Sequence, residues 1–375
     1  MVFPDYKRSI VNVSSSLINA FGGKPLYSPL KELDFIRDYG KSVLLVIDGL
    51  GYEFLQNYGK NSFLQKNCIA KITSTFPTTT ATAEVALETG VASQQHSLTG
   101  WNVLIKELGA VVRVLPFTPR FGDVSLAAGG VKRTDIFVEP GIGQKINIPS
   151  TTVLPVMTTN RCTGDGHSKY FQKLGGMVRH VQKSASLPGR RFIFAYWIKF
   201  DKISHKKGCA SPEAVAHFFE IDKAINKLAN FLKNKKTCLI VAADHGFVDV
   251  PRQNRIVLND YREIYDCLVL PLSGDTRAAN CYVRLGKEAE FKKLAKEQLG
   301  FCCDLCKGTD FIKRGVFGQG VPNSRLFERV GDYILVCKDG YLIRDLLLNE
   351  KMPDLIGYHG GMSEQEMFVP LIVAR

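Results

Sequence analysis

The sequence predicts an α/β fold: a mostly parallel central sheet with helices on both faces, into which a smaller α+β cap is inserted. Three apolar runs, 42–47, 192–198 and 238–241, are short and almost uninterrupted, as in strands that are covered on both faces. Segment 212–234 has apolar residues at helical intervals and lies between the second and third runs. A strand–helix–strand order of this kind is typical of a parallel sheet.

Further elements follow from the spacing of apolar residues and from turn residues. We expect helices over 10–21, 29–39, 171–183 and 288–299, and strands over 110–115, 279–285, 333–338 and 368–373. Segment 121–155 is rich in Gly, Pro and Thr with weak periodicity, which predicts an irregular excursion from the sheet. Short strands around helices characterise 252–352. We therefore assign 1–251 and 353–375 to a catalytic core and 252–352 to the cap.

Composition and charge narrow the class of protein. The chain has 375 residues, of which 45% are hydrophobic and 23% charged, ordinary values for a globular protein that buries a core. Its formal net charge of +13 favours anionic partners, which include nucleic acid, a membrane surface and phosphorylated small molecules. The Lys and Arg residues are spread along the chain without an RNA-binding or helix-turn-helix pattern, so no specific nucleic-acid recognition is predicted.

The cysteines and the hydropathy of the chain indicate the cellular compartment in which the protein is expected. The ten cysteines occur singly, except for Cys302, Cys303 and Cys306. Cys303 and Cys306 form a lone C-x-x-C without a second pair or a nearby His, so a zinc or redox site is the less favoured interpretation. The sequence has no signal-peptide pattern and no apolar stretch of transmembrane length. We expect a reducing, cytoplasmic location and no membrane span.

Carboxylates and imidazoles occur where strands end or where glycines turn the chain. Asp48 follows 42–47, and Asp244 and His245 follow 238–241. Open α/β sheets bind ligands at the carboxyl ends of their strands. Each residue alone fits a structural role, such as a turn cap or a packed imidazole, but several together indicate a metal site. The candidate metal ligands are Asp48, Asp201, His205, Asp244, His245 and His359.

This set of side chains predicts a particular chemistry. Mixed Asp and His ligation suits zinc, with manganese or iron as alternatives, and six ligands are enough for two ions. Two divalent ions about 4 Å apart are the standard device for in-line displacement at phosphorus. The expected partner is therefore an anionic, phosphorylated small-molecule substrate.

A threonine-rich segment supplies candidate hydroxyls. Thr78, Thr79 and Thr80 follow Pro77, and an Ala-rich continuation ends at Gly90, which predicts a short helix with a glycine stop. The threonines then lie at a helix N-terminus, where backbone N–H groups and the helix dipole favour phosphate oxygens. Helix capping by threonine is the alternative interpretation.

Five short motifs occur in a fixed order along the chain. They are Asp48-Gly49, then Phe76-Pro77-Thr78-Thr79-Thr80 with Thr89-Gly90, then Asp201 with His205, then Asp244-His245-Gly246, and finally His359-Gly360-Gly361. In this order they resemble the motifs of the alkaline phosphatase superfamily, and within it the type I phosphodiesterase/nucleotide pyrophosphatase family. No single motif is decisive, but their combination is specific. The resemblance covers most of the chain and implies an alkaline phosphatase-like fold.

The resemblance also implies a role for each matching residue. Thr80 would be the nucleophile, with Thr79 as second choice, and would form a covalent phosphothreonine. Asn102 would hold a phosphate oxygen and Tyr196 would be an aromatic residue of the substrate pocket. The ligands would divide into Asp48, Asp244 and His245 around the ion beside Thr80, and Asp201, His205 and His359 around the other.

Departures from the family pattern limit the substrate assignment. Ala81 stands where nucleotide-hydrolysing members carry an aromatic residue, which weakens a nucleotide assignment. Tyr196 stands where monoesterases of the superfamily place a carboxylate for Mg²⁺, which disfavours a phosphomonoesterase. The sequence thus predicts a two-metal hydrolase of phosphodiester or pyrophosphate bonds. The first alternative is a phosphonate hydrolase, phosphomutase or phosphomonoesterase of the same superfamily. The second is a basic nucleic-acid or membrane-surface binding protein with a degenerate enzyme fold.

Overall fold

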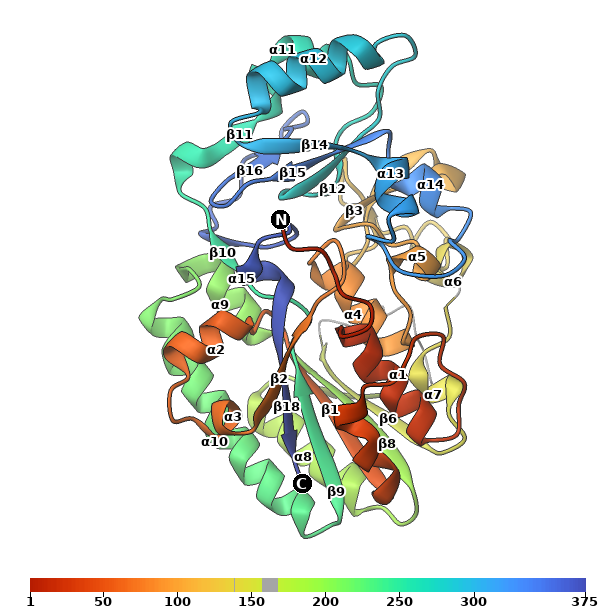
Figure 1. Ribbon diagram of the computed structural model, residues 1–375, viewed down its shortest axis with the longest axis vertical. Coiled ribbons are helices and arrows are strands. Elements are labelled where there is room, and N and C mark those ends of the chain that lie inside the picture. The colour runs from red at the N-terminus through yellow and green to blue at the C-terminus, as the bar shows by residue number, and fades with distance from the viewer. Residues whose placement is uncertain (138, 157–167) are drawn as a thin grey trace.

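The computed structural model describes residues 1–137, 139–156 and 168–375, which include two large sheets (Figure 1). The first sheet has seven strands in the order β2-β18-β9-β1-β8-β6-β7. Their bounds are β1 (Lys41–Ile47), β2 (Cys68–Thr73), β6 (Ser150–Pro155), β7 (Ser168–Phe171), β8 (Arg191–Trp197), β9 (Thr237–Ala242) and β18 (Phe368–Ala374). Strand β1 runs parallel to β8 and β9, and β6 runs parallel to β8 and β7. Only β18 pairs antiparallel among the described strands of this sheet, with β9 and β2, so the mostly parallel sheet is confirmed.

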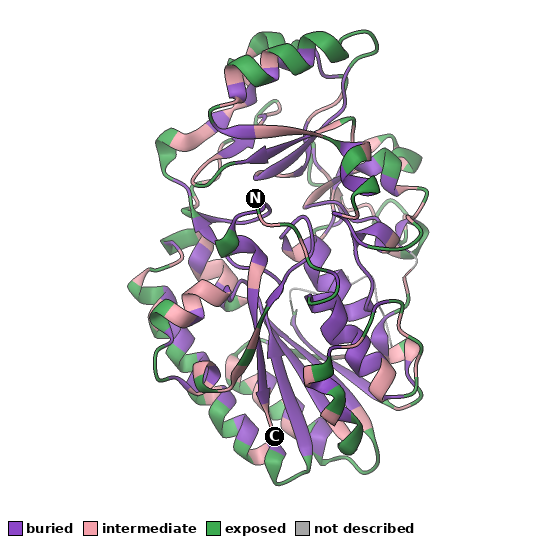
Figure 2. Ribbon diagram, in the orientation of Figure 1, coloured by how far each residue is buried: buried purple, intermediate pink, exposed green. Residues whose placement is uncertain are grey.

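Helices cover both faces of the first sheet (Figure 1). Those on one side are α1 (Ile10–Ala20) and α4 (Thr80–Thr89), and those on the other are α8 (Leu174–Ser186) and α10 (Pro212–Lys233). Helix α10 begins with Pro212 after the Ser211 hydroxyl, which accepts a hydrogen bond from the first turn. Ile221, Ile225 and Leu228 bury one side of this helix, whereas its outer side is exposed (Figure 2). The apolar spacing in the sequence therefore gave the correct buried face.

The second sheet also has seven strands, in the order β14-β15-β13-β12-β3-β4-β5. Their bounds are β3 (Asn102–Ile105), β4 (Ala110–Arg113), β5 (Thr118–Pro119), β12 (Ser273–Asp275), β13 (Ala278–Cys281), β14 (Cys303–Lys307) and β15 (Tyr333–Cys337). Four of these strands come from the proposed cap, 252–352, and three come from 102–119. The cap sheet thus includes a segment that precedes the cap in sequence, and the division of the chain into core and cap stays a proposal.

The remaining elements are short connections around the two sheets. The short helices are α2 (Tyr52–Tyr58), α3 (Phe63–Lys66), α5 (Ser93–His96), α6 (Arg133–Ile136), α7 (Ile142–Lys145), α9 (Lys199–Lys207), α11 (Arg262–Asp266), α13 (Gly308–Lys313), α14 (Leu326–Arg329) and α15 (Glu364–Met367), and the longer α12 spans Glu288–Leu299. The small paired strands are β10 (Val248–Asp249) with β17 (Gly357–Tyr358) and β11 (Arg255–Val257) with β16 (Leu342–Arg344). Segment 29–39 forms a 3₁₀ helix over Lys31–Asp38 rather than an α-helix.

Segment 121–155 contains a strand of the first sheet that the sequence analysis missed. Strand β6 is fully buried and pairs with β8, so the predicted irregular excursion is wrong for its last six residues. The strand starts Ser150-Thr151-Thr152. Threonine is β-branched and fits a pleated sheet, but a polar run of this kind gives no apolar signal.

The C-x-x-C motif lies in strand β14, which separates its two thiols. Cys303 packs with the apolar residues on one face of the cap sheet, beside Cys302 and Cys337. Cys306 packs on the other face. Side chains three residues apart point to opposite faces of a strand, so this pair does not form a shared metal or redox site. Among the described residues, no helix is long and apolar enough to cross a membrane.

Candidate active site

Three adjacent strands of the first sheet carry the candidate ligands at their carboxyl ends. Asp48 directly follows β1, and Asp244 follows β9 by two residues. Helix α9 starts two residues after β8 and carries Asp201 and His205 one turn apart, so both side chains lie on one face. His359 follows β17. The strand order β9-β1-β8 brings these separate segments together at one edge of the sheet.

Two groups of buried side chains could each hold a metal ion. Asp48, Asp244 and His245 place one ligand atom each within 4.8 Å of one another, as do Asp201, His245 and His359. His245 belongs to both groups: its Nε2 is 3.5 Å from Asp48 Oδ1 and 3.4 Å from Asp244 Oδ2. The first group is the set that the resemblance assigned to the ion beside Thr80.

His205 joins the second group through its neighbours. Its Nε2 lies 3.4 Å from Asp201 Oδ1 and 3.2 Å from His359 Nε2. The imidazoles of His245 and His359 also stack, with ring centroids 3.8 Å apart. All six candidate ligands predicted from the sequence therefore converge in one small region.

The imidazoles are oriented by backbone carbonyls. His205 Nδ1 lies 2.8 Å from Gly357 O, and His359 Nδ1 lies 3.1 Å from Thr78 O. A carbonyl oxygen only accepts, so each Nδ1 carries a proton and a neutral ring presents a lone pair at Nε2. Two such lone pairs facing each other repel unless a cation lies between them. Backbone contacts of this type are typical of metal-binding histidines.

The buried carboxylates of Asp48 and Asp201 would also be stabilised by a cation. Burial, followed by the charges of Asp201 and Asp244, raises the pKa of Asp48 well above its usual value. Burial also raises the pKa of Asp201, against the attraction of His205 and His245. The Oδ1 atoms of Asp48 and Asp201 are buried and make no hydrogen bond within the described part of the chain. Buried carboxylates without donors are stabilised when they coordinate a metal, so this donor set fits divalent cations.

Burial lowers the pKa of the neighbouring imidazole of His359, whereas it raises that of the carboxylates. The pKa of His359 lies well below the usual value because the ring is buried and because His245 and His205 lie beside it. A neutral imidazole is the form that binds a metal.

Thr80 lies where the ligands and helix α4 meet. It is the first residue of α4, and its Oγ1 is 3.1 Å from His245 Nε2, the nitrogen shared by both groups. Helix α4 ends at Gly90, whose φ of 72° is the left-handed conformation of a glycine stop. Thr79 is the N-cap residue and is fully buried, and its side chain is within hydrogen-bonding reach of Asp275. The geometry therefore favours Thr80 over Thr79 as the reacting hydroxyl.

The two residues predicted to bind substrate, Asn102 and Tyr196, lie in different sheets. Asn102 begins β3 in the cap sheet and lines a small recess together with Asp275 and Thr276, and neither a candidate ligand nor Thr80 is among the described residues that line it. Tyr196 is fully buried in β8, and its hydroxyl donates a hydrogen bond of 3.1 Å to Asp244 Oδ2. A buried ring cannot stack on a substrate, so the predicted pocket role of Tyr196 does not fit. The geometry instead makes Tyr196 a residue that positions Asp244.

The cap and the segment that follows His359 contribute residues that the sequence analysis missed. Arg277 and Glu366 are fully buried and form a two-pronged ion pair, with distances of 2.7 and 2.8 Å. Glu366 also accepts the backbone N–H of Gly361, in the loop that carries His359. Asp275 lies close by at the end of β12. Asp275 ends β12, Arg277 precedes β13, and Glu366 lies in the short helix α15. None of the three belongs to a motif, so no signal in the sequence pointed to them.

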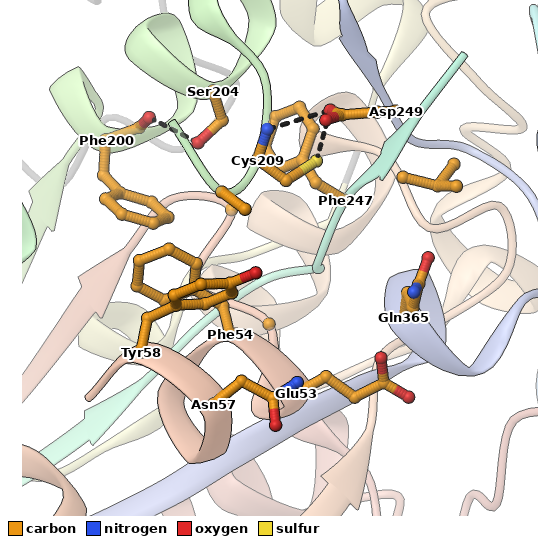
Figure 3. A pocket seen from close by; sticks show the side chains of 14 residues that line it. Glu53, Phe54, Asn57, Tyr58, Phe200, Ser204, Cys209, Phe247, Asp249 and Gln365 are labelled. Atoms are coloured by element: carbon orange, nitrogen blue, oxygen red, sulfur yellow. Dashed lines mark hydrogen bonds between the residues drawn. The ribbon is translucent and has the colours of Figure 1, made fainter. Parts of the chain in front are cut away.

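A separate cavity of about 340 Å³ is lined by residues of α2, α9 and segment 247–249 (Figure 3). The rings of Phe54, Tyr58 and Phe200 lie at one end of the cavity. Cys209, whose backbone N–H donates a hydrogen bond to Asp249 Oδ1, lies at the other end. Phe247 separates this cavity from the imidazoles, with its ring centroid 4.9 Å from that of His205. None of the described residues lining the cavity is a candidate ligand, and Thr80 is not among them, so this cavity is not the reaction site.

Comparison with known proteins identifies the family. The model of the type I phosphodiesterase/nucleotide pyrophosphatase family matches residues 42–362, which is most of the chain. The chain belongs to this family. No curated protein sequence matches it. Membership places it in the alkaline phosphatase superfamily and indicates a phosphoester hydrolase.

Solved structures agree with this family assignment. Murine ectonucleotide pyrophosphatase/phosphodiesterase 5 matches with a TM-score of 0.66 and 18% identity over 88% of this chain and 87% of that chain. The human counterpart matches with a TM-score of 0.66 and 18% identity over 89% and 87%. Phosphonoacetate hydrolase from Sinorhizobium meliloti 1021, in complex with phosphonoformate, gives 0.65 and 14% over 89% and 90%. At these identities the similarity shows the fold, which is the predicted alkaline phosphatase-like fold.

Proposed function

We propose that this family member is a two-metal phosphohydrolase that cleaves phosphodiester or pyrophosphate bonds through a covalent phosphothreonine at Thr80. The observation that carries the proposal is the distance of 3.1 Å between Thr80 Oγ1 and His245 Nε2, because His245 belongs to both candidate metal groups. A reacting hydroxyl is thereby held at the junction of the two groups.

The ligand geometry supports two cations, most simply zinc. Asp48, Asp244 and His245 would hold one, and Asp201, His205 and His359 the other. When bound, the two cations would activate the attacking oxygen and stabilise the leaving oxygen. The first group lies beside Thr80, and His245 also lies within 4.8 Å of ligand atoms of Asp201 and His359.

The steps assigned to the protein follow from its own side chains. Thr80 Oγ loses its proton and attacks phosphorus, the bond from phosphorus to the leaving oxygen breaks, the leaving group departs and takes up a proton from solvent, and the threonine carries the remaining phosphate group. The N-terminus of α4 favours the alkoxide and the phosphate oxygens. Asn102 would bind one phosphate oxygen. Water then cleaves the bond between phosphorus and Thr80, which restores the hydroxyl and releases the product.

A related protein gives independent support for a threonine nucleophile. An inactive threonine-to-alanine variant of murine ectonucleotide pyrophosphatase/phosphodiesterase 5 is known in complex with AMP, at a TM-score of 0.64 to this chain. In that protein, one threonine is thus required for activity while a nucleotide still binds.

The test uses hydrolysis of bis(4-nitrophenyl) phosphate by the purified full chain. Chelation should abolish the reaction, and zinc or manganese should restore it. Thr80→Ala should lower kcat by about a thousandfold or more, because the nucleophile is lost. Thr79→Ala is the matched control and should retain most of the activity. The opposite ranking of the two variants would place the nucleophile at Thr79, and metal-independent hydrolysis would overturn the two-metal mechanism.

A phosphonate hydrolase is the second candidate, because phosphonoacetate hydrolase has the same fold at a similar TM-score. Phosphonoacetate should therefore be assayed beside the diester with the same metal-loaded preparation. Faster cleavage of the carbon–phosphorus bond than of the diester would replace the first candidate by the second.

A further inference from the structure

The Thr78 residue joins the segment that leads into Thr80 to the loop that carries His359. Its hydroxyl oxygen Oγ1 accepts the backbone N–H of Gly360 at 3.2 Å and donates to the carbonyl oxygen of Gly361 at 2.9 Å. The carbonyl oxygen of Thr78 also accepts the Nδ1–H of His359 at 3.1 Å. One residue thus makes three hydrogen bonds to three consecutive residues that lie 281 to 283 positions later in the chain.

These contacts lie in the interior of the protein. Thr78 has no exposed surface, and His359 is 8% exposed. A buried backbone N–H or C=O group needs a hydrogen-bond partner, and the Thr78 hydroxyl is the partner of one group of each kind. A methyl group in place of this hydroxyl would take that partner away from both backbone groups.

His359 depends on such support more than the other two candidate imidazoles do. His205 lies within helix α9, and His245 follows the central strand β9. His359 instead follows the two-residue strand β17 and precedes two glycines. Gly360 has a φ of 113°, which an L side chain rarely adopts, and glycine has no side chain that could anchor the loop. The position of the His359 ring is therefore set by contacts from other segments.

The same loop also contacts the cap and helix α15. A Cβ atom on Gly360 would lie only 2.6 Å from Asp275 Cγ, so the loop backbone packs closely on the end of β12. The backbone N–H of Gly361 donates to Glu366 Oε1 at 2.8 Å. The Thr78 contacts add the connection between this loop and the segment of the proposed nucleophile.

We propose that the Thr78 hydroxyl is a positioning group for the second metal group: it fixes the loop of His359 so that the imidazole is held ready for the second cation. The inference rests on the proposed function and names the residue that joins this ligand to the nucleophile segment. The physical reason is that a group which orients a metal-binding histidine changes the metal affinity without touching the metal. Thr78 itself belongs to neither metal group.

The first test measures zinc affinity of the full chain without substrate, by competition with a chromophoric chelator. Thr78→Val keeps the shape of the side chain and removes the hydroxyl, so one of the two zinc ions should bind about tenfold more weakly or worse. Thr78→Ser keeps a hydroxyl and should restore the affinity. Thr82→Val is the matched control, because the Thr82 hydroxyl is also buried but donates to the carbonyl oxygen of Leu98, at 3.3 Å. This control should leave both zinc affinities unchanged.

The second test locates the effect at one metal group. In Asp201→Ala, which should retain only the ion of the first group, adding Thr78→Val should weaken zinc binding no further. Equal zinc affinities in the wild type and Thr78→Val would overturn the proposal, as would a further loss in the Asp201→Ala background.

Circular dichroism of the zinc-free variants completes the test. An unfolded Thr78→Val chain would also overturn the proposal, because the hydroxyl would then be required for the fold rather than for the ligand. A wild-type protein that binds two zinc ions but does not hydrolyse the diester would contradict the proposed function and not the role of Thr78. Absence of zinc binding in the wild type would contradict both.

Discussion

His245 is the residue that links the two candidate metal groups to the nucleophile. Its Nδ1 faces Gly246 O at 3.0 Å, which directs Nε2 towards Thr80, Asp48 and Asp244. The sequence revealed this residue because Asp244-His245-Gly246 ends a buried strand, and a strand end in a parallel sheet is a position for ligands. The carbonyl that orients the ring belongs to the adjacent glycine, and its contact became visible only in the structure.

The contact of Tyr196 with Asp244 and that of Asp275 with the loop of His359 could not be predicted from the sequence, for a related reason. Each contact depends on which face of its strand the side chain occupies and on which residues of the element packed against that face it meets. Tyr196 lies in an apolar run that is buried on both faces, so its position in the sequence does not show whether the ring reaches the pocket. Asp275 is the last residue of a three-residue strand, and its neighbour Gly360 is 85 positions away in sequence.

His96 predicts a pH dependence of stability that is independent of the metal site. Burial lowers its pKa from 6.5 to about 3, so the folded protein keeps the ring neutral while the unfolded chain binds a proton below about pH 6.5. Stability is therefore complete above the unfolded pKa and is lost as the pH falls. Between about pH 8 and about pH 5 the loss due to this residue should be about 2 kcal/mol.

Urea unfolding of wild-type protein and His96→Asn at both pH values measures this effect. Asn can accept the Leu98 N–H that His96 Nδ1 accepts, so it is a suitable replacement. The free energy of unfolding should fall by about 2 kcal/mol more in the wild type than in the variant. An equal fall in both proteins would show that His96 does not remain neutral in the folded state.

At the scale of elements, the long regular segments were predicted well. The helix α12 and the strands β1, β8 and β9 have clear periodicity or continuous apolar runs, and the structure places them within one or two residues of the expected bounds. Strand β6 was not predicted, because a run of threonines gives no apolar signal, and the helix predicted over 29–39 is a 3₁₀ helix over Lys31–Asp38, a tighter form that apolar spacing does not distinguish from an α-helix.

The buried pair of Arg277 and Glu366 joins the cap to the loop of His359. Replacing Arg277 by Met would leave the carboxylate of Glu366 buried without its partner, which typically costs about 3–5 kcal/mol of stability. The exposed pair of Arg252 and Asp354 is the matched control, with side chains 78% and 80% exposed. Arg252→Met should change the free energy of unfolding by less than about 1 kcal/mol.

Chemical denaturation of Arg277→Met and Arg252→Met measures how much each ion pair contributes to the free energy of unfolding. Arg277→Met should also weaken zinc binding, since Glu366 holds the backbone of Gly361 two residues after His359. A cost below about 1 kcal/mol for Arg277→Met would mean that the pair does not support the cap.

At the scale of the whole molecule, the site lies at the edge of the first sheet, where the cap sheet faces it. The first sheet carries the carboxylates after β1, β8 and β9, and the cap sheet carries Asn102, for which we propose a phosphate-binding role. A strongly basic surface would attract many anions at long range. Selection among them would then depend on the few groups next to the phosphate position.

The central claim is that six side chains hold two cations next to Thr80. Elemental analysis of zinc-loaded, exhaustively dialysed protein tests it most directly. We expect about two zinc ions per chain in the wild type and also in Thr80→Ala, because the threonine is the nucleophile rather than an essential ligand, and about one in Asp201→Ala. No retained zinc in the wild type, or an unchanged content in Asp201→Ala, would contradict the claim.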